Sequence, residues 1–143
     1  MANESKATTV WEGDLTSGRG TVSVASTALP DVEVTWAART ERTEDTTSPE
    51  ELLAGAHSAC FNMALSVGLA KAGSPPERLE TSASVTFVAG EGVKSSRIVV
   101  RGRVPGIDQA AFEEAARGAG ENCPISGALR GNVEITVDAT LES

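Results

Sequence analysis

One segment, from Leu52 to Ala70, constrains the fold more than any other because it contains no Asp, Glu, Lys or Arg. Its length is close to the ~20 residues that a membrane-spanning helix needs. However, it contains small and polar residues such as Gly55, Ser58 and Asn62, which weaken insertion into a bilayer. We therefore predict that it is the long central helix of a soluble protein with no membrane association.

The residues on either side of this segment predict where the helix begins and ends. Ser48 is a good N-cap and Pro49 suits the first helical position. Glu51 lies three residues after Ser48, where a capping box requires an acidic side chain. Gly73, followed by prolines at 75–76, predicts the end of the helix. Glu51 is thus expected to be structural, and Glu50 is left free to act.

Composition predicts a single domain that covers residues 1–143. The chain is 40% hydrophobic, but only 3% of its residues are aromatic and none is tyrosine. Its core must therefore be mostly aliphatic, and such a core would gain from dimerisation because rings bury more area per residue than aliphatic side chains do. The net charge of -8 and the lack of a basic block argue against nucleic acid as a partner. The N-terminus lacks the pattern of a secretory signal, so we expect the cytoplasm.

The rest of the chain predicts an α+β fold with largely antiparallel pairing. Hairpins are expected on both sides of the long helix rather than alternating strand–helix units. We expect strands at Thr8–Trp11, Gly20–Ala25, Val32–Ala38, Thr81–Val88, Arg97–Val104 and Val133–Leu141. Residues Thr40–Thr47 predict a mobile loop. We expect a short helix that Asp108 caps and that ends at Ala116, before Gly118 and Gly120 interrupt it, and a further turn or two at Pro124–Leu129.

The two cysteines are the best indication of function. Cys60 lies in the middle of the long helix, and Cys123 precedes Pro124, which suits the first position of another helix. The thiolate is the reactive form, and a helix N-terminus or a nearby cation lowers the pKa of a thiol. This rule favours Cys123, whereas Cys60 would need an external cation. Arg39 and Arg19 are the nearest candidates, and physical reasoning alone does not rank them. The competing interpretation of each cysteine is a small buried apolar residue.

His57 is the only histidine, and it lies three residues before Cys60 on the same side of the helix. Three roles remain open: a base for Cys60, a zinc ligand together with Cys60 and Cys123, or a core residue hydrogen-bonded to a backbone group. The zinc role lacks a fourth ligand and a Cys-x-x-Cys pair, and the core role is favoured. No phosphate-binding loop or dinucleotide fingerprint is present.

A distance argument limits how Glu50 and Cys60 would share one site. A continuous helix from one residue to the other spans ~15 Å, which is beyond the reach of a glutamate side chain. Either the helix breaks near Gly55, or Glu50 comes from a partner subunit. We prefer the partner.

Two motifs resemble the osmotically inducible protein C (OsmC) family. They are Ser48–Phe61, which includes His57 and Cys60, and Asn122–Ser126, which includes Cys123. Segments Trp11–Gly13, Gly18–Val22 and Val104–Asp108 resemble that family as well, so the likeness covers nearly the whole chain. It implies an OsmC-like fold in which antiparallel sheets pack around a long central helix, and an intertwined cytoplasmic homodimer with its sites at the subunit interface. It also implies a thiol-dependent peroxidase that reduces organic hydroperoxides and, less well, hydrogen peroxide. No metal, haem or flavin is implied.

The resemblance also assigns roles by position. Cys60 would be the peroxidatic thiolate that becomes a sulfenic acid, and Cys123 would resolve it as a disulfide. An external dithiol of unknown identity would then reduce that disulfide. Arg39 matches the arginine of the OsmC branch, and Glu50 would orient it. In the sister branch, the organic hydroperoxide resistance proteins, the arginine comes from the first hairpin, so Arg19 is the second choice, together with His57.

One other class of function fits the same residues. A redox-sensing or hydrophobic-ligand-binding dimer would form the disulfide without sustained turnover. Its apolar pocket, like that of a peroxidase for alkyl peroxides, would be lined by Phe61, Met63 and Leu65. Plain core packing is the competing interpretation of these three side chains.

Overall fold

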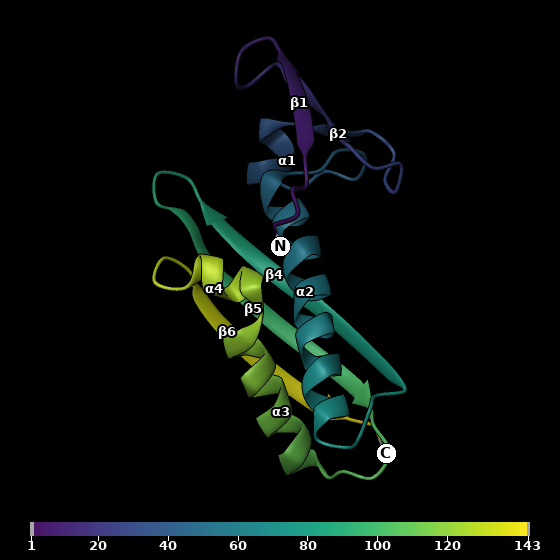
Figure 1. The fold of residues 1–143 in the computed structure, drawn as a ribbon. Helices are drawn as coiled ribbons and strands as arrows, with labels where there is room; N and C mark the ends of the chain where they lie inside the picture. Colours follow the sequence, from purple (N-terminus) through teal and green to yellow (C-terminus); the bar gives the residue numbers. More distant parts are fainter. Residues whose placement is uncertain (1, 143) are drawn as a thin grey trace. The chain divides into compact units, whose positions relative to one another are not determined.

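The computed structural model describes residues 2–142, which divide into two compact units, one ending at Leu52 and one beginning at Leu53. Figure 1 shows the elements in chain order. The first unit holds the first three strands and α1, and α2 runs from the first unit into the second. The elements are β1 (Ala7–Glu12), β2 (Arg19–Val24), β3 (Val32–Val34), α1 (Trp36–Thr40), α2 (Pro49–Lys71), β4 (Arg78–Val88), β5 (Gly92–Arg103), α3 (Gln109–Asn122), α4 (Pro124–Leu129) and β6 (Glu134–Leu141).

In the first unit, β1, β2 and β3 form an antiparallel sheet in that order. Trp11 pairs with Gly20, where a Cβ atom would come within 2.9 Å of both the Trp11 ring and Val34. Gly20 therefore lets the side chains of the neighbouring strands cross β2 closely. The predicted strand Val32–Ala38 is wrong in its second half, because β3 ends at Val34 and α1 follows.

The chain turns from strand to helix at Thr35. Its hydroxyl oxygen accepts a hydrogen bond from the Ala38 N–H at 3.1 Å, which is the pattern of an N-cap. The alternation of Val32, Val34 and Trp36 is typical of a strand, but the N-cap at Thr35 ends the strand before Trp36. As a result Arg39 lies on a short helix rather than in a strand.

The long helix α2 begins and ends as predicted. The Ser48 hydroxyl accepts from the Glu51 N–H at 3.1 Å, and Gly73, at φ = 91°, lies just after the last turn. The helix is continuous through Gly55, so the break considered from the sequence does not occur. By length and composition alone α2 could cross a membrane, although the core helix of a soluble protein meets the same criteria.

In the second unit, β4, β5 and β6 form a sheet in that order, drawn from teal to yellow in Figure 1. β4 and β5 are an antiparallel hairpin, and Gly90 and Gly92, both at positive φ, shape its turn. β6 pairs with β5 in parallel, which the prediction of antiparallel sheets did not include. The reason is that α3 and α4 carry the chain back across the sheet, so that β6 runs in the same direction as β5.

α3 is longer than predicted, because it runs through Gly118 and Gly120 to Asn122. The prediction that these glycines interrupt the helix is wrong. A Cβ atom on Gly120 would lie 2.9 Å from a methyl carbon of Val137 on β6. The glycine thus allows the helix to pack closely on the strand, and this contact outweighs the low helix propensity of glycine.

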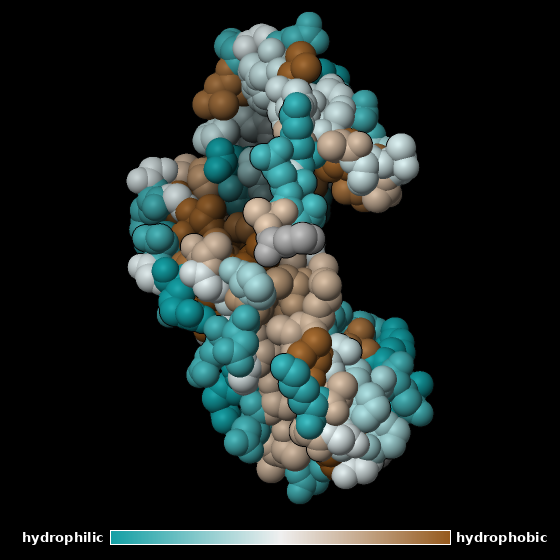
Figure 2. Space-filling view, in the orientation of Figure 1, coloured by the Kyte–Doolittle hydropathy of each residue, from teal (hydrophilic) through white to brown (hydrophobic). Residues whose placement is uncertain are grey.

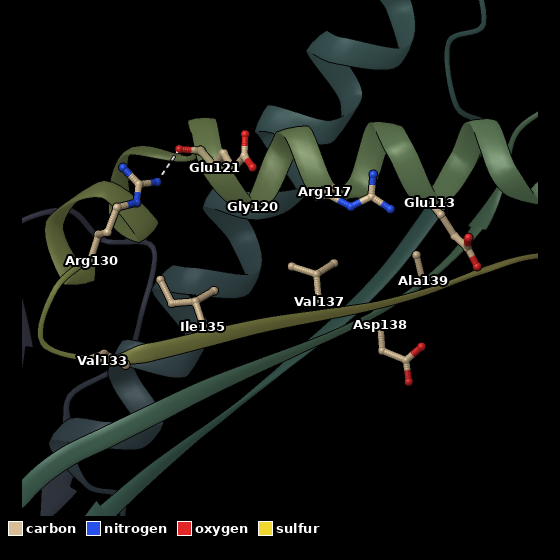
Figure 3. A pocket seen from close by; sticks show the side chains of 10 residues that line it. All are labelled: Glu113, Arg117, Gly120, Glu121, Arg130, Val133, Ile135, Val137, Asp138 and Ala139. Atoms are coloured by element: carbon tan, nitrogen blue, oxygen red, sulfur yellow. Dashed lines mark hydrogen bonds between the residues drawn. The ribbon is translucent and has the colours of Figure 1, made fainter.

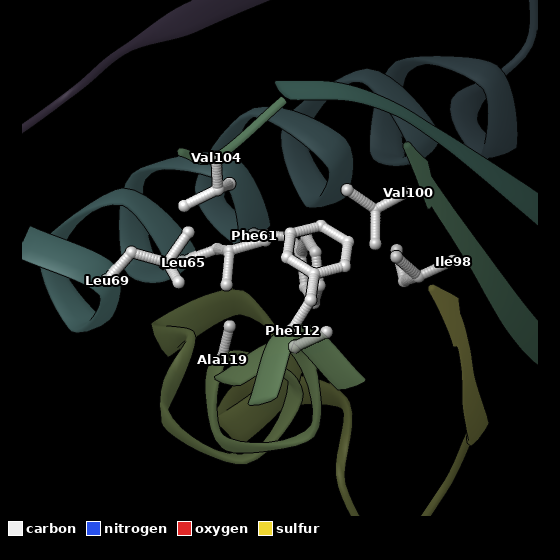
Figure 4. Close-up of a cluster of buried hydrophobic side chains, with 9 residues drawn as sticks. Phe61, Leu65, Leu69, Ile98, Val100, Val104, Phe112 and Ala119 are labelled. Atoms are coloured by element: carbon white, nitrogen blue, oxygen red, sulfur yellow. The ribbon is translucent and has the colours of Figure 1, made fainter. Parts of the chain in front are cut away.

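The core of the second unit lies between α2, α3 and the sheet (Figure 4). Phe61, Leu65 and Leu69 project from α2 toward Phe112 of α3 and Val100 of β5. Truncating a fully buried Phe112 to Ala would cost about 3–5 kcal/mol of stability. Layers of helix and sheet without repeating strand–helix units make this an α+β fold, as predicted. Phe61 and Leu65 are core residues here, whereas Met63 is exposed.

Candidate functional site

The two cysteines both belong to the second unit, and both are free thiols. Cys60 is half-buried on α2. Cys123 is 1% exposed and lies where α3 ends and α4 begins. Its N–H donates to the Ala119 carbonyl at 2.9 Å, and its own carbonyl accepts from the Gly127 N–H at 3.0 Å. Cys123 therefore caps α4, the position that Pro124 predicted.

Each thiol shifts the pKa of the other. Burial and the interaction with the Cys123 side chain raise the pKa of Cys60. Burial also acts to raise the pKa of Cys123, but interactions with the Cys60 thiol and with Ser126 outweigh it, and the pKa of Cys123 is lowered. The backbone N–H groups of Ser126 and Ile125 also act to lower the pKa of Cys123. The pKa of Cys123 is thus lowered although Cys123 is the more buried of the two thiols.

Arg39 and Glu50 come together in the first unit. Arg39 Nε donates to both carboxylate oxygens of Glu50 at 3.1 Å, and its Nη2 donates to Oε2 at 2.9 Å. The Glu50 side chain is 8% exposed and that of Arg39 is 31% exposed. A fork of this kind fixes the plane of the guanidinium group. The arginine is thereby held in one orientation while part of it stays open.

The rival Arg19 is in a different setting. Its guanidinium group pairs with Glu33 at 3.2 Å on the strand surface, and the Arg19 side chain is 66% exposed. Exposed pairs of this kind hold a side chain only weakly. Arg39, held by a nearly buried carboxylate, is the better ordered of the two arginines.

Glu51 behaves only in part as the capping box predicted. Its N–H donates to the Ser48 hydroxyl, but its carboxylate accepts from the Thr47 hydroxyl. The acid therefore ties the loop before α2 to the first turn of the helix. It is structural, as expected, and Glu50 is the carboxylate of this turn that binds Arg39.

His57 is fully buried on α2 between two serine hydroxyls. Nδ1 lies 2.6 Å from Ser96 Oγ on β5, and Nε2 lies 2.8 Å from Ser126 Oγ on α4. Burial lowers the pKa of the imidazole, so it is neutral at pH 7. His57 is thus a core histidine, the role favoured from the sequence, but its partners are two serine hydroxyls and not the expected backbone group.

Sequence reasoning missed Ser96 and Ser126. Ser126 carried a local signal, because it follows the predicted cap Cys123 by three residues, the spacing at which a cap and the first turn of its helix meet. Ser96 carried none, since only the pairing of β4, β5 and β6 brings it to His57. Among residues 2–142, no cluster of three or more His, Cys, Asp or Glu side chains is arranged to hold a metal ion.

A cavity of about 480 Å³ lies between α3 and β6 (Figure 3). Val137 and Ile135 form its apolar floor, and Arg117 and Arg130 alternate with acidic side chains around it. Arg130 donates to the Glu121 carbonyl. None of the six site residues predicted from the sequence lines this cavity, so it is separate from the thiol pair.

Comparison with known proteins gives consistent matches. The family model for OsmC-like protein matches residues 42–138. The chain is 38% identical to peroxiredoxin OsmC of Escherichia coli (strain K12), and the alignment covers all of both chains. It is 33% identical to the organic hydroperoxide resistance protein of Xanthomonas axonopodis pv. citri, over 65% of this chain and 66% of that one.

Solved structures show the same fold at lower identity. The OsmC-like protein of Mycoplasma pneumoniae superposes with a TM-score of 0.75 at 16% identity, covering all of both chains. The organic hydroperoxide resistance protein OhrB of Bacillus subtilis superposes with a TM-score of 0.68 at 23% identity, over 94% of this chain and 98% of that one. The matches in sequence and in fold agree with the resemblance seen in the two cysteine motifs. The chain belongs to the OsmC-like protein family.

Proposed function

We propose that the protein is a thiol-dependent peroxidase that reduces organic hydroperoxides and, less well, hydrogen peroxide. The observation that carries the proposal is a pair of free thiols in the second unit, a half-buried Cys60 on α2 and a buried Cys123 between α3 and α4. Two free thiols in a member of this family are suited to reversible oxidation to a disulfide. The relatives named peroxiredoxin and organic hydroperoxide resistance protein support the same reaction class.

Accessibility decides which thiol meets the peroxide. The pKa of Cys123 is lowered, but Cys123 is 1% exposed, whereas Cys60 is half-buried. A peroxide must reach the sulfur that attacks it. We therefore assign the first step to Cys60 and the second to Cys123, as the family resemblance implies.

The proposed reaction has three steps. The Cys60 thiolate attacks one oxygen of the hydroperoxide, the O–O bond breaks, and the alkoxide leaves and takes up a proton to become the alcohol. Cys60 is now a sulfenic acid. The Cys123 thiolate attacks that sulfur, an S–S bond forms, and hydroxide leaves and is protonated to water. An external dithiol reduces the disulfide, returns both thiols and becomes a disulfide itself.

Arg39 supplies the positive charge that Cys60 needs. Burial raises the pKa of Cys60, so at neutral pH most of it is a thiol unless a cation stabilises the thiolate. A guanidinium group fixed by Glu50 is suited to this role and to polarising the peroxide O–O bond. Because α2 is continuous, we propose that the Arg39–Glu50 pair of one subunit serves Cys60 of its partner.

The surface of α2 supports a homodimer. Met63 is 72% exposed and Val67 is 53% exposed, four residues apart on one face of the helix. Figure 2 shows the apolar, tan to brown surface along α2 in the second unit. Exposed apolar patches of this kind mark interaction surfaces, and a second copy of the chain would cover this one.

The experiment is consumption of cumene hydroperoxide by the wild type and by Cys60→Ser, with excess dihydrolipoamide as the dithiol. We expect many turnovers in the wild type and none above background in the variant. Peroxide that leaves both thiols free in a folded protein would contradict the proposal. Disulfide formation without sustained turnover would instead support the redox-sensing or ligand-binding dimer.

A further inference from the structure

The proposed reaction leaves one buried polar cluster without a role. His57, Ser96 and Ser126 are all 0% exposed, and they come from α2, β5 and α4. Nδ1 of His57 lies 2.6 Å from Ser96 Oγ, and Nε2 lies 2.8 Å from Ser126 Oγ. Either tautomer of a neutral imidazole makes both bonds, because each hydroxyl can donate or accept. The ring therefore links three elements of the second unit by directional bonds.

Ser126 is the residue that anchors α4 in the second unit. Of Pro124–Leu129, the six residues of this helix, Ser126 is the one that is buried. A helix this short has little stability of its own. Its place against α2 therefore depends on the hydrogen bond from Ser126 to His57. A hydrogen bond fixes distance and direction, whereas apolar contacts allow two elements to slide.

Each partner of this bond lies one helical turn from a cysteine. Cys60 follows His57 by three residues on α2, and residues three apart are neighbours on a helix surface. Cys123 is the N-cap of α4 and precedes Ser126 by three residues, so these two also share one side. The Cys123 carbonyl accepts from the Gly127 N–H at 3.0 Å, which ties the cysteine to α4. The bond thus holds the turns that carry the two cysteines against each other.

Disulfide formation depends on such placement. The two Cα atoms of a disulfide are about 4.4–6.8 Å apart, and their Cβ atoms point toward each other. Thiols held in register meet at a higher effective concentration than thiols on elements that move independently. Loss of register would lower that concentration without removing either thiol.

We propose that His57 is a positioning residue for disulfide formation, and that its bond to Ser126 keeps Cys123 in register with Cys60. The inference rests on the proposed function, in which Cys123 attacks the Cys60 sulfenic acid. In this role the imidazole exchanges no proton with peroxide or thiol. The bond to Ser96 orients the ring on β5 and is not part of the link between the two cysteines.

The test is the equilibrium between the protein and a dithiothreitol redox buffer. The protein dithiol passes two electrons and two protons to oxidised dithiothreitol, which gives the protein disulfide and reduced dithiothreitol. The chain has only two cysteines, so an intrachain disulfide joins Cys60 to Cys123. Mass spectrometry after thiol alkylation measures the oxidised fraction. A non-reducing gel identifies any disulfide between chains.

The two serines provide the first matched pair. Ser126→Ala should lower the equilibrium constant for disulfide formation about fivefold, which corresponds to the loss of one hydrogen bond. Ser96→Ala deletes the same buried hydroxyl from the other side of the ring. It should cost similar stability in urea unfolding but leave the equilibrium constant close to the wild-type value. The comparison separates positioning from general destabilisation.

Two replacements of His57 provide the second pair. His57→Gln places an amide group near the position of Nε2 and keeps a partner for Ser126, so its equilibrium constant should stay close to that of the wild type. His57→Asn reaches only the position of Nδ1 and should lose as much as Ser126→Ala. This pair decides the question if Ser126→Ala does not fold.

Equal constants in the wild type and Ser126→Ala would overturn the proposal. Equal losses in the two serine variants, or in the two His57 variants, would overturn it as well, and so would a wild type that forms no intrachain disulfide at any buffer composition. Failure of the proposed function is a separate result, since cumene hydroperoxide would then not be consumed even though the disulfide forms.

Discussion

Arg39 and Glu50, in the unit that ends at Leu52, are a charged pair, and the arginine side chain is 31% exposed. In the unit that begins at Leu53, His57, Ser96 and Ser126 are fully buried and uncharged beside the thiols. Glu50 holds the guanidinium group of Arg39 in one orientation. A thiol in buried surroundings is not ionised without help. The fixed positive charge and the two thiols thus belong to different units of the chain.

The largest effect on activity should come from removing the guanidinium charge of Arg39. Arg39→Ala should lower the rate of peroxide consumption by about 10²–10³-fold, which is typical for one preorganised donor at a developing negative charge. Arg19→Ala is the matched control, because it removes an arginine from the same unit and should leave the rate nearly unchanged. The initial rate with cumene hydroperoxide measures both. A larger loss in Arg19→Ala than in Arg39→Ala would reverse the assignment.

A smaller effect on activity should follow from replacing the Glu50 carboxylate, which holds Arg39 in place. Glu50→Gln keeps the shape of the side chain but loses the charge-assisted hydrogen bonds to the guanidinium group. We expect the rate to fall about tenfold, since a hydrogen bond between charged groups is worth more than a neutral one. Steady-state kinetics at several peroxide concentrations provide the measurement. An unchanged rate would mean that Arg39 is ordered by something else.

The buried cluster should show its effect in the pH dependence of stability. The pKa of His57 is lowered by burial, so the unfolded chain binds a proton first as the pH falls below 6.5. The stability of the wild type is therefore fully present above pH 6.5 and is lost as the pH falls toward the folded pKa, by at most about 1.4 kcal/mol per pH unit. His57→Gln cannot titrate and should show a shallower loss.

Urea unfolding between pH 7.5 and pH 5.5 would compare the two proteins. If the free energy of unfolding falls equally with pH in the wild type and in His57→Gln, burial does not lower the pKa of His57.

The smallest effect should be the loss of stability when an exposed ion pair of the first unit is broken. Arg19→Ala breaks an exposed ion pair with Glu33, and we expect a change of about 0–1 kcal/mol in the free energy of unfolding. Adding salt should shrink even this difference, because exposed charges are screened. A loss of several kcal/mol, measured by urea unfolding, would show that this pair is a structural anchor.

The sequence predicted best where a local signal decides the structure. Ser48, Pro49 and Gly73 determine the ends of α2, and Pro124 places Cys123 at a helix cap. The α+β class followed from the order of strands and helices. The rule for helix termini favoured Cys123 for thiolate chemistry, and the structure places Cys123 at the N-cap of α4.

The sequence predicted less well where a contact between distant parts of the chain determines the structure. Gly120 looks like a helix breaker but is required by the close approach of Val137, and Ser96 reaches His57 only through the folded sheet. The parallel pairing of β6 depends on the crossover through α3, which no local pattern displays. The alternation of Val32, Val34 and Trp36 predicted a strand, but the N-cap at Thr35 starts a helix at Trp36.

Complementation between two inactive variants tests whether Arg39 of one subunit acts on Cys60 of its partner. Arg39→Ala and Cys60→Ser chains would be unfolded together, refolded, and assayed for consumption of cumene hydroperoxide. If Arg39 of one subunit serves Cys60 of its partner, each mixed dimer has one intact site, and random pairing restores about a quarter of the wild-type activity. If activity stays at the sum of the two separate variants while refolded wild type recovers fully, the partner subunit does not supply the charge and the account is wrong.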